Sequence, residues 1–100
     1  MPLDPYRTEI DALCRRHGVK KLELFGSAAR GEFEEQHGDY DFFVEFLSYE
    51  SPTIADQWFG LQEGLERLLG RPVDLVSRRA ARNPYFIESA NRDAVTLYAA

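Results

Sequence analysis

Residues 24–47, LFGSAARGEFEEQHGDYDFFVEFL, decide how this 100-residue chain is expected to fold. The stretch leaves an apolar strand, breaks at Gly26-Ser27, crosses a polar loop and enters a second apolar run at Asp39 and Asp41. Carboxylates at the mouth of a run that must be buried are costly unless something offsets their charge. The stretch therefore predicts a strand–turn–strand unit that also carries a site for chemistry.

Helical and strand patterns extend outward from this stretch in both directions. Three segments have the apolar or alternating pattern of strands: residues 19–25, 39–47 and 73–77. Four segments are expected to be helices: residues 4–17, a short one that Ser27 caps through Arg30, residues 53–69, and a short one near 85–91. The order helix-strand-helix-strand-helix-strand-helix predicts an α+β fold, a small sheet covered by helices on at least one face.

Composition and charge exclude several classes of protein. The chain is 44% hydrophobic and 29% charged, which is ordinary for a folded domain, and its length predicts one domain over residues 1–100. The net charge of -5 argues against direct nucleic-acid binding. No apolar run approaches the roughly 18 residues of a membrane span, so no membrane partner is expected. The single Cys14 excludes an internal disulfide, and no apolar segment follows Met1, so the expected location is the cytoplasm.

The acidic residues of the strands predict a metal site. Asp39 and Asp41 are two residues apart on one strand, so their side chains point to the same face, opposite to Phe42. Neighbouring carboxylates raise each other's cost of ionisation, and a divalent cation relieves that cost. Carboxylate pairs commonly bind Mg²⁺ together with substrate phosphates. Asp74 repeats the pattern within an apolar run of the third strand, and all three acids meet at one site if the second and third strands are neighbours.

The turn at Gly26-Ser27 predicts a phosphate site. Glycine lets the backbone approach a ligand closely, and Ser27 adds a hydroxyl donor at the start of a helical segment, where phosphate binding is favoured. Arg30 follows on that segment and either approaches the phosphates or lies on the surface. The basic residues after the third strand, Arg78, Arg79 and Arg82, either contact phosphates or an acidic partner, or lie in a solvated loop.

The motif from Leu24 to Gly31, followed by Asp39-Tyr40-Asp41, resembles the signature of the DNA polymerase beta-like nucleotidyltransferase superfamily. The short length and the VDLV strand at residues 73–76 are similar to its minimal nucleotidyltransferase (MNT) antitoxin branch. The resemblance implies a nucleotidyltransferase fold with a mixed sheet, ATP as substrate and Mg²⁺ as cofactor.

The same resemblance implies roles for individual residues and a partner. Gly26 and Ser27 would hold the triphosphate, with Arg30 as a further nucleotide-binding residue. Asp39, Asp41 and Asp74 would be the catalytic, metal-binding acids, with Asp74 also helping to deprotonate the acceptor. Many members of the branch are antitoxins that attach AMP to a tyrosine of a HEPN-domain toxin, so a hetero-oligomer with such a toxin is expected.

Two other functions stay open at this point. Family members often carry Arg where this chain has Ala28, and Ser where it has Gly38. These departures favour, as one alternative, a non-catalytic antitoxin that binds its toxin sterically. The other alternative is a nucleotidyltransferase acting on a small-molecule or RNA hydroxyl, because fold alone does not choose the acceptor.

Overall fold

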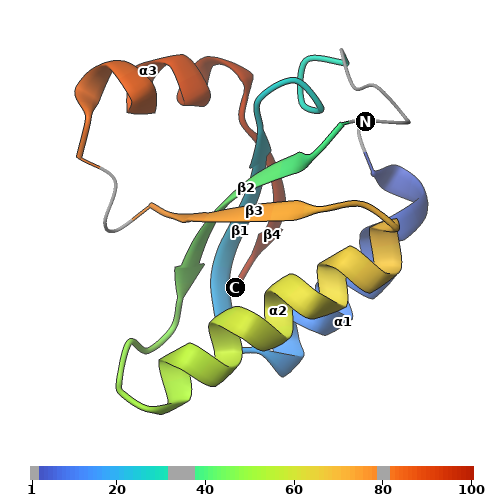
Figure 1. The fold of residues 1–100 in the computed structure, drawn as a ribbon, viewed down its shortest axis with the longest axis vertical. Helices are drawn as coiled ribbons and strands as arrows, with labels where there is room; N and C mark the ends of the chain where they lie inside the picture. The colour runs from blue at the N-terminus through green and yellow to red at the C-terminus, as the bar shows by residue number, and fades with distance from the viewer. Residues whose placement is uncertain (1–2, 32–37, 79–81) are drawn as a thin grey trace.

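A computed structural model of the chain describes residues 3–31, 38–78 and 82–100 (Figure 1). Its elements in chain order are a 3₁₀ turn η1 (Asp4–Tyr6), α1 (Arg7–Arg16), β1 (Val19–Phe25), β2 (Tyr40–Phe46), α2 (Thr53–Leu69), β3 (Val73–Ser77), α3 (Pro84–Asp93) and β4 (Val95–Ala99). The predicted α+β class is confirmed. The middle of the polar loop, 32–37, and Arg79 lie outside the described residues.

The four strands form one mixed sheet in the order β3-β2-β1-β4. β1 pairs antiparallel with both β2 and β4, and β2 pairs parallel with β3. The second and third strands of the sequence prediction are therefore neighbours. β4 was not predicted: it is a five-residue edge strand, and its pairing with β1 shifts register between Leu22 and Glu23. β4 begins two residues after the last residue of α3, and no Gly or Pro between them marks a strand boundary.

The helix predicted after Ser27 is absent, and the segment is a turn. The carbonyl of Gly26 accepts hydrogen bonds from the amides of Ala29 (3.1 Å) and Arg30 (3.2 Å), which makes a single helical turn. Gly31, at a φ of 79°, lies in the left-handed region and ends it. The Ala28 side chain is buried in the larger hydrophobic core of the protein, and this contact anchors the turn to the sheet.

Apolar side chains cover the sheet on both faces. The larger core lies on the face with α1 and α2, where fully buried residues from the sheet and both helices meet: Ile10, Cys14, Leu22, Leu24, Phe42, Val44, Leu61 and Leu65. A smaller cluster of Phe25, Phe43 and Ala90 lies on the other face, where α3 packs. In Figure 1, α3 stands apart from α1 and α2, which lie side by side. No helix in the described ranges is long and apolar enough to cross a membrane.

Candidate active site

Asp41 and Asp74 lie directly beside each other in the sheet. The parallel register of β2 and β3 aligns these two residues, and the antiparallel register of β1 and β2 places Phe25 on the other side of Asp41. Both carboxylates are on the face that α3 partly covers, because Phe43 and Val76, each two residues further along, belong to the smaller cluster. The predicted meeting of acids from two strands is thus present in the structure.

The surroundings of Asp41 disfavour its charge. Burial, in the first place, raises the pKa of this carboxyl above its ordinary value, and the negative charges of Asp74 and then Asp39 raise it further. A side-chain hydrogen bond with Asp74 acts in the same direction, and such a bond requires a proton on one of the two carboxyls. Asp41 is therefore a carboxylate whose ionisation an added cation would favour.

Gly26 brings the backbone of the turn against this carboxylate. Its φ is 77°, and a Cβ atom built on it would lie 2.7 Å from Oδ2 of Asp41, closer than real contacts of this kind. A side chain at position 26 would therefore displace the Asp41 carboxylate. The turn and the acid pair form one continuous site with Ser27, which follows Gly26 and is partly exposed.

The three acids do not converge equally. Asp39 precedes β2 and is exposed, although it is near enough to raise the pKa of Asp41. Over the described ranges, no three acidic, histidine or cysteine side chains make a group that could hold a metal ion by themselves. The Asp41–Asp74 pair fits Mg²⁺ in another way, since this ion usually binds one or two carboxylates and completes its shell with substrate phosphates and water. The roles predicted for the three acids stay predictions.

Arg30 ties the turn to α3. Its Nη1 donates a hydrogen bond to Oδ2 of Asp93 at 3.3 Å, and both side chains remain partly exposed. Position 28, where the family often has Arg, faces the core instead. Arg30 is a cation that lines the cleft together with Gly26.

A small cleft separates the turn from α3. Its volume is about 150 Å³, and it is lined by one stripe of α3 and by the turn: Phe86, Ser89, Ala90 and Asp93 facing Phe25, Gly26 and Arg30. The Phe86 ring packs edge-on against the rings of Phe25 and Phe43, with both centroid distances 5.8 Å. The cleft and the acid pair share Gly26 as their boundary.

Arg78 fixes α3 above the sheet. Its Nε donates to Oε1 of the buried Glu23 at 2.8 Å, its Nη2 donates to Oδ1 of Asn91 at 2.7 Å, and its guanidinium lies 4.3 Å from the Phe43 ring centroid. These internal contacts contradict the solvated-loop alternative for Arg78, whereas a contact with phosphates or an acidic partner stays a prediction. Arg82 is exposed, as a solvated loop residue would be.

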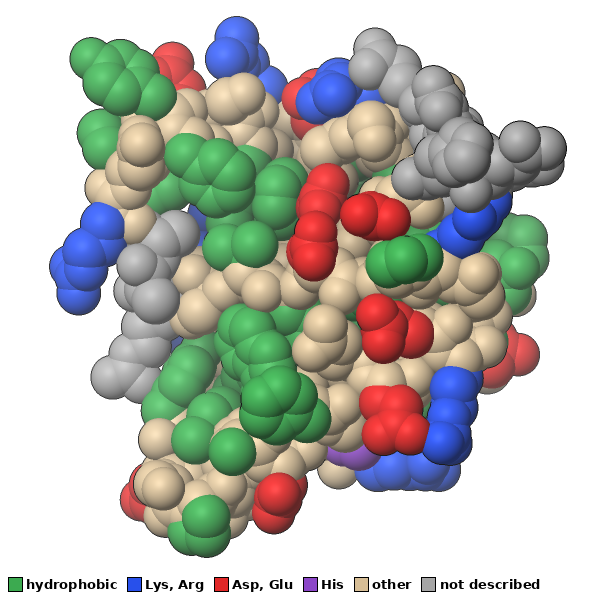
Figure 2. All heavy atoms as spheres, in the orientation of Figure 1, with side chains coloured by type: hydrophobic (Ala, Val, Ile, Leu, Met, Phe, Trp, Pro, Cys, Tyr) green, Lys and Arg blue, Asp and Glu red, His purple; other side chains and the backbone are tan. Residues whose placement is uncertain are grey.

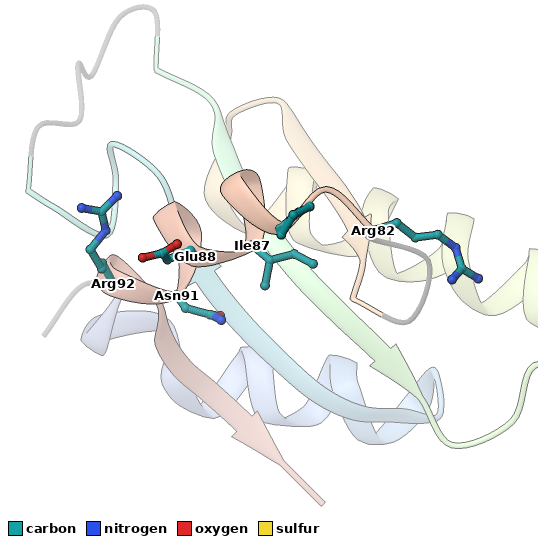
Figure 3. A pocket seen from close by; sticks show the side chains of 6 residues that line it. Arg82, Ile87, Glu88, Asn91 and Arg92 are labelled. Carbon is teal, nitrogen blue, oxygen red and sulfur yellow. The ribbon is translucent and has the colours of Figure 1, made fainter.

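A larger hollow of about 550 Å³ lies on the side of α3 opposite to the cleft (Figure 3). Arg82 and Arg92 stand at its two ends, with Ile87, Glu88 and Asn91 between them. On the face drawn in Figure 2, acidic side chains gather over the region of β2, β3 and the adjoining part of α2. The acidic surface therefore lies over the same strands as Asp41 and Asp74. The basic residues Arg82 and Arg92 lie at the hollow on the other side of α3.

Sequence reasoning missed Glu23, Phe86, Ser89 and Asp93. Nothing in the sequence pattern indicated that Glu23 is buried, because a charged residue that alternates with leucines on a strand usually faces water. Asn83-Pro84 gave the start of α3, where Asn83 Oδ1 accepts from the amides of Tyr85 and Phe86. Spacing within α3 could have grouped residues 86, 90 and 93 on one side, but only the fold shows that this side faces Gly26.

Comparisons with known proteins agree with the resemblance inferred from the motif. The model of the nucleotidyltransferase domain family matches residues 7–97. A candidate protein adenylyltransferase of Methanocaldococcus jannaschii is 36% identical over 96 residues, which is 88% of this chain and 94% of the relative. The protein adenylyltransferase MntA of Thermococcus cleftensis is 39% identical over 71 residues, 71% of this chain and 68% of the relative.

Solved structures share the fold. One described as a candidate minimal nucleotidyltransferase is 38% identical, with a TM-score of 0.74 over 93% of this chain and 90% of that one. A Y104A variant of the toxin–antitoxin pair MntA–HpeT contains a chain that is 25% identical, with a TM-score of 0.67 over 93% of this chain and 72% of that one. The predicted nucleotidyltransferase fold is thus confirmed.

Proposed function

The chain belongs to the nucleotidyltransferase domain family, and from this premise we propose that it transfers AMP from ATP to a tyrosine hydroxyl of a partner HEPN-domain toxin, neutralising that toxin. The observation that carries the proposal is the Asp41–Asp74 pair on adjacent strands with Gly26 packed against it. Relatives named protein adenylyltransferase and the toxin–antitoxin neighbour support a protein acceptor.

Each residue of the site has a definite task in this reaction. The amides of the turn at Gly26-Ser27 and the Ser27 hydroxyl bind the triphosphate and hold its α-phosphorus still. Asp39, Asp41 and Asp74 would hold Mg²⁺, which, when bound, neutralises charge on the phosphates. Asp74, which is exposed and pairs with Asp41 in the sheet, takes the proton of the acceptor hydroxyl.

The bonds made and broken balance. The tyrosine oxygen forms a bond to the α-phosphorus, the bond from that phosphorus to the β-phosphate bridging oxygen breaks, and pyrophosphate leaves with the electron pair. Asp74 is exposed, so an acceptor hydroxyl can approach it from outside the fold. The proposal needs no redox partner.

The test is transfer of label from α-labelled ATP to protein. The purified chain, Mg²⁺ and lysate of its own host are incubated beside an Asp41→Asn variant and a matched Asp56→Asn variant, which removes an exposed acid on α2. A labelled band that survives in Asp56→Asn and disappears in Asp41→Asn supports the proposal, and its mass identifies the partner. No labelled band with any of the three proteins would contradict it.

One observation favours a second function, neutralisation of a toxin by steric binding. The acids do not all converge: Asp39 is exposed and precedes β2, and over the described ranges no three acidic, histidine or cysteine side chains form a group that could hold a metal ion. In that case Asp41→Asn would neutralise the toxin as well as the unaltered chain does. If Asp41→Asn still binds the toxin and no longer protects cells from it, steric neutralisation is wrong.

A further inference from the structure

The cleft between the Gly26 turn and α3 has the size and lining of a site for one flat ring. Its volume of about 150 Å³ is below the roughly 300 Å³ at which pockets for drug-sized ligands begin. It therefore suits a single heterocycle better than a whole nucleotide. Because Gly26 borders both the cleft and Asp41, a molecule whose phosphates lie on the turn can extend its other end into the cleft.

Phe86 gives this cleft an aromatic wall that is held in place. The Phe25 and Phe43 rings, themselves stacked at 4.2 Å, lie at steep interplanar angles of 87° and 70° to the Phe86 ring. These contacts use the side of Phe86 that faces the sheet, and the residue still keeps 39% of its surface exposed. An immobilised ring that remains accessible is a good stacking surface, because little side-chain entropy is lost when a ligand binds.

Polar groups lie at the edge of the same cleft. Ser89 is exposed and carries a hydroxyl that can donate or accept. The Asp93 carboxylate, which accepts one hydrogen bond from Arg30, has further acceptor capacity for an amino group. An apolar face with a few polar groups at its rim is the usual arrangement for a nucleobase.

We propose that this cleft binds the purine base of the nucleoside triphosphate, with Phe86 as its stacking surface and Ser89 and Asp93 at its edge. The assignment rests on the proposed function, since it concerns the same nucleotide. A purine covers more of the Phe86 ring than a pyrimidine does, so the cleft discriminates between nucleotides by stacked area. Arg30 lines the same cleft and donates a hydrogen bond to Asp93 at its edge.

The test compares two ligands that differ in whether they carry a base. ATP and inorganic tripolyphosphate are titrated calorimetrically, with Mg²⁺, into the unaltered chain and its variants. Phe86→Leu keeps the apolar packing against Phe25 and removes the aromatic face, whereas Phe86→Tyr keeps that face. Ser89→Trp fills the cleft from an exposed position, and Glu88→Trp places the same bulk on the other side of α3, outside the cleft.

Phe86→Leu is expected to weaken ATP binding about 5- to 150-fold, the range of base–aromatic stacking, and to leave tripolyphosphate binding unchanged. Ser89→Trp should have the same selective effect, and Phe86→Tyr and Glu88→Trp should bind ATP normally. An unchanged ratio of ATP to tripolyphosphate affinity in Phe86→Leu and Ser89→Trp would overturn the base site while the proposed function stands. Failure of the unaltered chain to bind either ligand would instead overturn the proposed function, and this assignment with it.

Discussion

Gly26 is the residue where the turn and the Asp41 carboxylate come closest, so its substitution tests the site directly. Gly26→Ala requires a non-glycine residue at a φ of 77° and places a Cβ 2.7 Å from Asp41 Oδ2. The left-handed conformation alone costs about 1–2 kcal/mol, and the displaced carboxylate adds to it. We expect lower stability in urea unfolding and a loss of AMP transfer of at least about tenfold.

Gly31→Ala is the matched control for this prediction. Gly31 lies in the same turn at a φ of 79°, but a Cβ there would meet nothing within 4 Å. Gly31→Ala should lower the free energy of unfolding by a similar amount, through the left-handed backbone alone. Its AMP transfer should stay near that of the unaltered chain. Equal activity losses in the two variants would show that backbone strain, and not contact with Asp41, explains the requirement for glycine at position 26.

Asp41 illustrates a conflict between stability and chemistry at one residue. Its pKa is raised in the folded chain by burial, by Asp74 and by Asp39. The folded state therefore holds a proton more tightly than the unfolded state does, and stability falls as the pH rises from the ordinary value of 3.8 through the raised one. Asp41→Asn should be about 0.2–1 kcal/mol more stable than the unaltered chain at pH 7, and inactive.

The pH dependence distinguishes this effect from a general change in charge. In the presence of a chelator, the advantage of Asp41→Asn should vanish below pH 3.8, where both Asp41 and its unfolded counterpart are protonated. Glu88→Gln removes one exposed acid of α3 and should show no such dependence. Thermal unfolding of the three proteins at several pH values decides the matter, and a pH-independent gain in Asp41→Asn would contradict the explanation.

At the scale of elements, α3 depends on Arg78 for its position above the sheet. Among the described residues, Arg78→Met would leave the buried Glu23 carboxylate with the Lys21 ammonium at 3.9 Å as an ion-pair partner, and would remove the hydrogen bond to Asn91. We expect a loss of about 2–3 kcal/mol in the free energy of unfolding. A second change, Glu23→Gln, should restore part of that loss, because no unpaired charge then remains.

Arg67→Met is the control for the Arg78 prediction. Arg67 also contacts a carboxylate, Glu63 at 2.6 Å, but both side chains are largely exposed on α2. Such a pair contributes within about 0.5 kcal/mol, so its loss should hardly move the urea midpoint. Comparable losses from Arg67→Met and Arg78→Met would mean that burial of Glu23 does not determine the effect.

The elements that sequence predicted well are those whose pattern repeats or whose ends are marked. Residues 53–69 match α2 because five apolar positions recur in register and Gly70, at a φ of 68°, ends the helix. β4 and the Ser27 turn depend instead on tertiary contacts. β4 is defined by pairing with β1, and the turn by Ala28 entering the core.

The candidate site likewise contains residues that the sequence predicted and residues that only the fold brings together. Asp41 and Asp74 were predictable because acids inside apolar strands are rare, and the parallel register of β2 and β3 then brings them together. The wall of the cleft was not predictable, because Phe86 and Asp93 face Gly26 only once α3 folds back over β1. Arg78 resembled a loop cation in sequence, and its contact with Glu23 spans 55 residues of chain.

At the scale of the whole molecule, the two faces of the sheet have different tasks. The α1–α2 face is closed by large apolar side chains and accounts for most of the buried core. On the α3 face, the described residues form the smaller cluster of Phe25, Phe43 and Ala90, with Val76 and Ala94 packed against it, and this face leaves room for the acids and the cleft. A ligand that binds the α3 face should therefore stabilise a fold whose core lies on the opposite face.

Cys14 allows this coupling to be measured, because it is buried in the α1–α2 core and is the chain's single cysteine. Burial, and secondarily Asp11, raises the pKa of its thiol from 9.0 to about 12, so the native chain should react very slowly with a thiol reagent at pH 8. Reaction then requires unfolding, and its rate should rise with urea. Stability should also fall as the pH rises above about 9, where the unfolded thiol ionises and the folded one does not.

ATP with Mg²⁺ at 100 times its dissociation constant should slow labelling of Cys14 about 100-fold, because binding to the folded state alone lowers the unfolded fraction by that factor. Gly26→Ala, which disturbs the site on the far face without touching Cys14, should lose this protection. Inorganic sulfate at the same ionic strength serves as the control for a general salt effect. If the labelling rate changes with neither urea nor ATP, the reagent reaches Cys14 through local opening of α1. Ligand binding on one face of the sheet would then not stabilise the core on the other face.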